Sequence, residues 1–317
     1  MLSRVAENVY WLSRYLERIE NTARMINVHG RSLMDTHGSG SDEGWLSLIA
    51  ISGMTDLFFE NFEQANEANI TEFLICDTRN PGSIINGTYA IKNNLRSSRD
   101  IFPKQLYERI STLIRYAKRE TENGISIVDR RLFLDTIERL VLEISGAVHG
   151  SLRHDQAYKF MRMACYLERA DMTTRVLDVP STTTPSGDQP ETLVPFENRD
   201  WTAVLRSISA VQMYRRHVRR PVDAEGCLNF LLNDSQLPGA CRFCFEHLDR
   251  CLEHFKHNSR ARASVQQLIG QLNSADIPAL AKDASVRHQY LDQLQLGLLV
   301  TGNIISETYF PPATESL

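Results

Sequence analysis

Glutamate and arginine side chains recur at the same spacing in two distant stretches of the chain. Residues 15–24 read YLERIENTAR and residues 166–175 read YLERADMTTR, so Tyr, Leu, Glu, Arg, Thr and Arg keep their places. A repeated apolar pattern would indicate only a repeated fold, whereas a repeated charged pattern indicates that both copies have the same electrostatic role. Carboxylates and guanidinium groups in this pattern can pair with each other, bind a charged ligand or hold a metal ion.

Helical geometry places these charges in rows. In each copy the two acids and the last arginine are spaced i, i+3 and i+7, so they share one face of a helix. These rows are Glu17, Glu20 and Arg24 in the first copy and Glu168, Asp171 and Arg175 in the second. Arg18 and Arg169 lie on the other flank of the apolar seam.

Three interpretations of the rows remain open from the residues alone. They can form an ion-pair network that fixes how two parts of the chain dock. They can present carboxylates and guanidinium groups into one cleft, as a binding or catalytic surface. Four carboxylates, two per helix, can also hold Mg²⁺ or Mn²⁺. Because Arg24 and Arg175 already supply positive charge on the same rows, we predict no metal and no cofactor.

Further landmarks repeat in the same order at an offset of 151 to 157 residues. They are Trp45 and Trp201, Pro81-Gly82 and Pro238-Gly239, and Leu134-Asp135 and Leu291-Asp292. Collinear landmarks at one offset predict a tandem duplication. We expect a single α-helical domain over residues 1–317, with repeat halves at about 1–150 and 151–317 and a Pro/Ser/Thr-rich loop near 180–187 between them.

Apolar spacing predicts helices almost everywhere. Between residues 2 and 26, apolar residues recur at alternating steps of three and four, and residues 160–177 repeat this seam. Other helices are expected over 103–121, 129–149, 199–218, 240–257 and 288–308, with Pro81 and Pro238 at helix starts. No alternating strand pattern exceeds a few residues. The expected fold class is therefore all-α, a helical bundle of two pseudo-symmetric halves.

Composition sets the broad class. The 317 residues are 42% hydrophobic and 23% charged, with a formal charge of −4, which is typical of a folded soluble protein and excludes a globally basic nucleic-acid binder. No window approaches the roughly 20 apolar residues of a membrane span. Six cysteines without dense spacing, and no apolar signal core, favour the cytoplasm.

Other candidate motifs favour structural interpretations. Cys241, Cys244 and Cys251 fall on an apolar stripe with His247 and His254 at its flank, which indicates core packing and not zinc. The basic run 215–220 is typical of a solvated helix end, with an anion or an acidic partner as the alternative. Residues 38–41 are expected to form a linker. Arg96 and Arg99 are expected either to form a basic patch separate from the helix start at residues 80–83 or to pair with acids.

Several motifs together resemble the Alpha-E family of bacterial helical domains. The opening LSRVAENVYWLSRYLER at residues 2–18 is similar to the N-terminal signature of that family, and the second YLER to its internal one. The NPGSI of residues 80–84, followed by Arg96 and Arg99, is similar to its middle motif, and Asp234, Pro238 and Arg242 to a later one. The sequence departs from the pattern at Cys165, where a basic residue is expected, and at Leu237.

The resemblance implies partners but no reaction. Genes of the family are associated with circularly permuted ATP-grasp ligases and with transglutaminase-like proteins, which implies an accessory protein in an amide-forming pathway. We expect binding of such a ligase, or of its peptide substrate, through a cleft between the halves, and no interaction with nucleic acid or membrane. The expected site residues are Glu17, Arg18, Glu20, Arg24, Arg96, Arg99, Glu168, Arg169, Asp171 and Arg175. The alternatives are an enzyme of the same pathway, dependent on Mg²⁺ or Mn²⁺, and a purely structural scaffold.

Overall fold

The computed structural model describes residues 1–34, 42–182 and 194–311, and within these ranges it contains helices and no strand. The predicted all-α fold class is confirmed. The α-helices are α1 (Ser3–Met34), α2 (Asp42–Ser52), α3 (Thr55–Asn61), α4 (Glu67–Ile75), α5 (Ile84–Ser97), α6 (Lys104–Asn123), α7 (Ile127–Ser151), α8 (Gln156–Thr182), α9 (Val194–Ser207), α10 (Val211–His217), α11 (Ala224–Asn233), α12 (Cys241–Leu252), α13 (Ser259–Asn273), α14 (Ile277–Lys282) and α15 (Ala284–Tyr309). A short 3₁₀ helix, η1, covers Arg99–Ile101.

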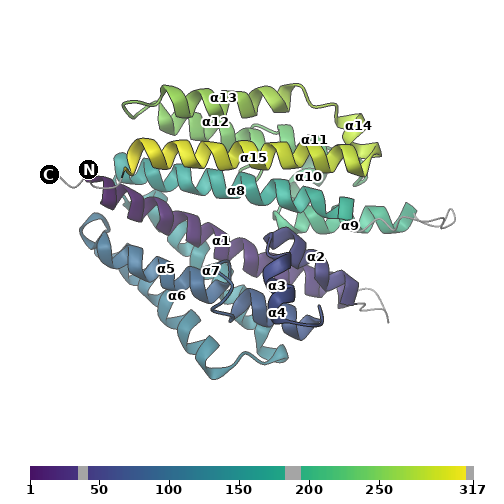
Figure 1. Ribbon diagram of the computed structural model, residues 1–317, viewed down its shortest axis with the longest axis horizontal. Helices are drawn as coiled ribbons and strands as arrows, with labels where there is room; N and C mark the ends of the chain where they lie inside the picture. Colours follow the sequence, from purple (N-terminus) through teal and green to yellow (C-terminus); the bar gives the residue numbers. More distant parts are fainter. Residues whose placement is uncertain (35–41, 183–193, 312–317) are drawn as a thin grey trace.

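Two long helices, α1 and α8, lie side by side at the centre of the molecule (Figure 1). Both carry the YLER motif. The predicted seam on α1 is buried, with Val9, Leu12 and Ile19 fully inaccessible to solvent. On α8 the corresponding apolar side chains, Met163 and Ala170 among them, are buried in the same core cluster. The apolar period of the sequence therefore brings the two motifs onto facing helices.

The other helices pack around this central pair in two sets. Helices α5 and α7 pack on α1 with α6 against both, while α12 and α15 pack on α8 with α13 against both. These sets lie on opposite sides of the central pair in Figure 1. Helices α2 and α9 each contact both α1 and α8. One apolar core runs through both sets, and the last turn of α15 returns to the start of α1, where Phe310 packs on Tyr10.

Some predicted helix boundaries were wrong. The helix expected over 199–218 is interrupted, because α9 ends at Ser207 and α10 begins at Val211. Ser209 has a left-handed backbone conformation, with φ of +56°, which ends a helix. Helix α12 ends at Leu252, short of the predicted residue 257. Helix α5 begins at Ile84, with Ser83 as its N-cap, and α12 at Cys241, so the Pro–Gly turns precede these helices and do not open them.

Two predicted loops fall on or beside the gaps in the description. Helix α8 continues to Thr182, so residues 180–182 are helical and not the start of the predicted loop. Residues 183–187 of that loop, and the linker predicted over 38–41, lie outside the described residues. Among the described helices, none combines the length and the apolar character that crossing a membrane requires.

Candidate functional site

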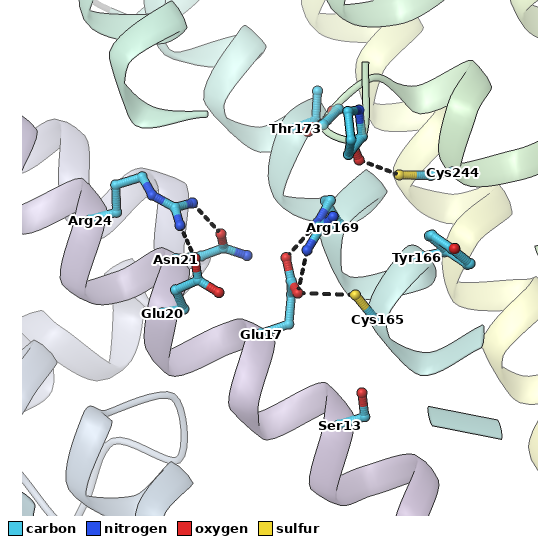
Figure 2. A network of polar contacts seen from close by, with 12 residues as sticks. Ser13, Glu17, Glu20, Asn21, Arg24, Cys165, Tyr166, Arg169, Thr173 and Cys244 are labelled. Carbon is cyan, nitrogen blue, oxygen red and sulfur yellow. Dashed lines mark hydrogen bonds and ion pairs between the residues drawn. The ribbon is translucent and has the colours of Figure 1, made fainter. Parts of the chain in front are cut away.

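The two YLER motifs bind each other across the α1–α8 interface. The Arg18 guanidinium donates to both oxygens of Glu168, with Nε–Oε1 at 2.6 Å and Nη2–Oε2 at 3.0 Å. In the same way, the Arg169 guanidinium donates hydrogen bonds to both oxygens of Glu17, with Nε–Oε1 at 2.6 Å and Nη2–Oε2 at 2.9 Å (Figure 2). The side chains of Glu17 and Glu168 are only 5% and 2% exposed. Two buried bidentate ion pairs therefore join the central helices.

The two pairs differ at one position. Glu168 also accepts a hydrogen bond from Arg14 Nε at 2.5 Å. Cys165 holds the position in α8 that Arg14 holds in α1, and its thiol donates to Glu17 Oε2 at 3.1 Å. The cysteine at position 165, where a basic residue was expected, therefore gives Glu17 a thiol as a hydrogen-bond donor where Glu168 has a guanidinium.

Burial alone would raise the pKa of each of these carboxyl groups, yet both stay ionised. The charges of Arg14 and Arg18 outweigh burial at Glu168 and lower its pKa to about 2. At Glu17, Arg169 and the Cys165 thiol outweigh burial and also lower the pKa. Burial raises the pKa of the Cys165 thiol to about 12, so this cysteine remains protonated near neutral pH.

Glu20 and Arg24 form a second pair one turn further along α1. Arg24 donates to Glu20 and, at 3.2 Å, to Asn21 Oδ1, and its Nε lies 3.5 Å from Glu138 Oε2 of α7. Burial is the main cause that raises the pKa of Glu20 to about 7, and the negative charges of Glu17 and Glu138 add to it. Glu17 and Glu20 thus have pKa values shifted in opposite directions within one helical turn.

The counterpart of this pair on α8 has different surroundings. Arg175 Nε donates to Asp171 Oδ2 at 2.9 Å. Its guanidinium lies against Gly53, where a β-carbon would be only 2.8 Å from Arg175 Nη1. Gly53 has a φ of +70°, so this position in the turn after α2 favours glycine in two ways. Arg175 is therefore packed against backbone.

Arg24 lines a cleft of about 560 Å³ among α1, α7, α9 and α10, which we call the junction cleft. The described residues that line it are Arg24, Asn27 and Val28 of α1, Asp135 and Glu138 of α7, Arg206 of α9, Ser209, and Val211 and Gln212 of α10. Asn27 Nδ2 donates to Asp135 Oδ1 at 2.9 Å and to Glu138 Oε1 at 2.8 Å, so one amide orients both carboxylates.

Most of the ten predicted site residues lie in the central network, and Arg24 is the member that also lines the junction cleft. Arg96 ends α5 and Arg99 lies in η1 with its guanidinium 5.4 Å from the Tyr107 ring; both side chains are exposed and neither lines the cleft. The sequence did not single out Asn27 or Arg206. Asn27 follows Arg24 by three residues and so shares its face of α1, which is a usable signal.

Other candidate sites take the structural roles expected of them. Cys241, Cys244 and Cys251 are buried in the core, and burial raises the thiol pKa of Cys241 to about 12. His247 and His254 each hydrogen-bond a carbonyl of their own helix. Over the residues that the structure describes, no three His, Cys, Asp or Glu side chains gather as a metal site would require.

The basic run ends α10. That helix stops at His217, and Arg220 pairs with Asp223 at 3.3 Å. The expected solvated helix end is what the structure has, with one of its arginines paired to the start of the next helix.

These features define a helical protein in which two central helices exchange glutamate–arginine pairs. The family model described as "Alpha-E: A predicted alpha-helical domain with a conserved ER motif" matches residues 1–310. The chain belongs to the Alpha-E family. No curated protein and no solved structure matches the chain.

Proposed function

We propose that the chain is a non-catalytic accessory protein that binds an ATP-grasp-type amide ligase through the junction cleft. The ligase class comes from the gene association that family resemblance implies. A transglutaminase-like protein would be a second partner in the same pathway. The proposal also takes the protein to be bacterial and cytoplasmic, which accords with six cysteines that form no disulfide.

One observation carries the proposal: a member of the repeated charged row lines a cleft. In a purely structural scaffold the charged rows would be buried, mutually paired and away from any pocket. The rows are paired and largely buried, but they are not all away from a pocket. Arg24 is shared between the central network and the junction cleft, where Arg206 is also exposed. The cleft lies between helices from the first and the second half of the chain, as expected for a site at the junction of two halves.

The buried pairs support an accessory role over the catalytic alternative. The metal-assisted enzyme would need its four acids free to bind a cation. Glu17 and Glu168 use both of their oxygens on arginines, and Asp171 is paired with Arg175. These pairs fix how α1 and α8 dock, and thereby fix the position of Arg24 at the cleft.

The similar packing of the two helix sets supports a further part of the proposal, that the chain arose by tandem duplication. The neighbours of α1 are α5 and α7, and those of α8 are α12 and α15. Each pair is covered by one more helix, α6 or α13. On this proposal the reciprocal Glu–Arg pairs are related by a pseudo-twofold axis between α1 and α8.

The test is a binding measurement between this chain and a purified ATP-grasp-type ligase encoded beside its gene. We expect a complex that the charge-reversing variant Arg206→Glu weakens at least about tenfold. Arg215→Glu, at an exposed arginine of α10 outside the cleft, is the matched control and should leave binding unchanged. Absence of a complex would overturn the proposed partner, and equal weakening by both variants would overturn the cleft as the docking site.

A further inference from the structure

Among the described residues, the charged groups that line the junction cleft are of both signs. Arg24 and Arg206 supply two positive charges, and Asp135 and Glu138 supply two negative ones. A cleft built for a phosphate or another anion would show one sign of charge, because carboxylates in the lining would repel the ligand. A lining that offers groups of both signs is complementary to a ligand that also carries both signs.

The cleft has the size and the apolar surface for a small molecule. A volume of about 560 Å³ lies within the range of roughly 300–1,000 Å³ that is common for small-molecule sites. Val28 of α1 and Val211 of α10 add apolar surface to the lining. A short aliphatic part of a ligand would pack there while its charged ends reach the polar residues.

The charged groups are positioned before any ligand arrives. Asn27 holds one oxygen of Asp135 and one of Glu138 through a single amide nitrogen. Glu20 and Asn21 accept hydrogen bonds from the Arg24 guanidinium, as Figure 2 shows, and Glu138 lies 3.5 Å from its Nε. Groups that are already oriented lose little conformational entropy on binding, which favours affinity and specificity.

Arg206 contrasts with these fixed groups. Its side chain is exposed, it comes from α9, and no salt bridge to it occurs among the described residues. Its planar guanidinium is suited to bidentate binding of a carboxylate. Nearby, Ser209 retains a left-handed φ of +56°, which is unfavourable for a residue with a side chain and is the kind of strain that collects at binding sites.

We propose that the junction cleft binds a zwitterionic ligand of the amino-acid or short-peptide class, with Arg206 on its carboxylate and Asp135 and Glu138 facing its ammonium group. This inference rests on the proposed function in taking the same cleft as the binding site. It adds the chemical class of what occupies the cleft, and it would make the protein a carrier or sensor of the building blocks that an amide ligase joins.

The test is calorimetric titration of the purified chain without any ligase. The probes are L-alanine and the dipeptides Ala-Ala, Ala-Glu and Ala-Lys, at concentrations up to about 10 mM. We expect at least one dipeptide to bind, and its N-acetylated and C-amidated forms to bind at least about tenfold more weakly, because each lacks one charge. Binding of none of these probes, or equal binding of the blocked forms, would overturn the inference.

Two variants test which residue of the cleft binds the carboxylate of the ligand and which binds its ammonium group. Arg206→Ala should abolish the preference for a free carboxylate over an amide while keeping the preference for a free ammonium group. Asp135→Asn should abolish the preference for a free ammonium group while keeping the preference for a free carboxylate. Arg215→Ala is the matched control and should retain both preferences. Loss of both preferences in the control would contradict the assignment. Because no ligase is present, failure here leaves the ligase complex standing, and failure of the ligase complex leaves this result standing.

Discussion

The motifs on α1 and α8 place the same residue types at the same positions, yet their carboxylates have different neighbours. Glu168 accepts hydrogen bonds from two arginines, Arg14 and Arg18. Glu17 accepts hydrogen bonds from Arg169 and from the thiol of Cys165. One substitution, cysteine in the place of arginine, accounts for this difference. A buried carboxylate with two cationic partners is held more strongly in its ionised form than one with a single cationic partner.

A second difference lies one turn further along each helix. On α1, Arg24 reaches the junction cleft, whereas on α8 its counterpart Arg175 packs against Gly53. The reciprocal pairs are common to both copies, and the open polar cleft was found beside one of them. We infer that the shared part of the motif holds the helices together, and the proposed binding site lies in the part where the surroundings of the two copies differ.

The largest effect is expected on removing Glu168. Glu168→Ala would leave Arg14 and Arg18 without their carboxylate, and breaking a buried pair in this way costs about 3–5 kcal/mol. Glu17→Ala should cost at least about 1 kcal/mol less, because it leaves one arginine, Arg169, without its carboxylate instead of two. Urea denaturation of the two variants measures both losses in the free energy of unfolding.

The control for that pair of variants is Glu143→Ala. Glu143 pairs with Arg109 and Arg139 at the surface, and the loss should stay within about 1 kcal/mol. Equal losses for Glu168→Ala and Glu17→Ala would contradict the asymmetry between the two motifs. The low pKa of Glu168, about 2, adds a pH signature: its stabilising contribution is complete above about pH 4.3 and is lost as the pH falls toward 2.

Glu20 is expected to act on stability in the opposite direction. Its folded-state pKa of about 7 lies above the unfolded value of roughly 4.3, so the folded state retains a proton that the unfolded state has released. The free energy of unfolding should therefore fall as the pH rises from about 4.3 to about 7. Glu20→Gln should remove this decrease and stabilise the protein at pH 8 by up to about 3 kcal/mol.

Urea denaturation at several pH values from 4 to 8 measures this effect. Glu122→Gln, on the exposed side of α6, controls for the loss of one negative charge. An unchanged pH slope in Glu20→Gln would show that the Arg24 pair fully compensates burial. It would also remove one distinction between the acids of the first motif, because Glu17 has a lowered pKa.

A smaller effect is expected at Cys165. Cys165→Ala removes the thiol donor to Glu17 and some buried volume, and should lower the free energy of unfolding by about 1–2 kcal/mol. Cys251→Ala is the matched control, because Cys251 is equally buried but is not bonded to a carboxylate. If both variants lose the same free energy in urea, the thiol–carboxylate bond contributes nothing and Cys165 serves only to fill space.

Local patterns account for what the sequence predicted. The three-and-four spacing of apolar residues on α1 depends only on helical geometry, so its buried face could be predicted. The i, i+4 pairing of Arg24 with Glu20 and of Arg175 with Asp171 is equally local. The cross-helix pairing of Glu17 with Arg169 was not specified, because it depends on the register in which α1 and α8 dock.

The junction cleft could not be predicted for the same reason. Arg206 and Arg24 meet only because α9 packs back onto α1, and the turn that separates α9 from α10 directs Ser209 and Gln212 to the cleft. That turn falls inside a stretch with continuous helical periodicity. Its left-handed residue is a serine, which gives a weaker signal for a helix end than glycine does.

The smallest effect, and the sharpest comparison between the two surroundings, is expected at the two left-handed turns. Gly53 and Ser209 both have positive φ, at +70° and +56°, in the turns that follow α2 and α9. Ser209→Gly should raise the free energy of unfolding by about 0.5–1 kcal/mol, because glycine adopts this conformation without steric strain. Gly53→Ala should lower it by about 1 kcal/mol, since the added β-carbon also approaches Arg175.

Thermal and urea denaturation of both variants show whether the free energy of unfolding rises in Ser209→Gly and falls in Gly53→Ala. If Ser209→Gly stabilises the protein and also weakens dipeptide binding, the strained serine is retained for its place in the cleft and not for folding. Stabilisation with unchanged binding would confine the functional part of the cleft to its charged residues. Destabilisation by Ser209→Gly would show that the serine side chain makes a contribution larger than its backbone strain, and the two turns would then no longer be comparable.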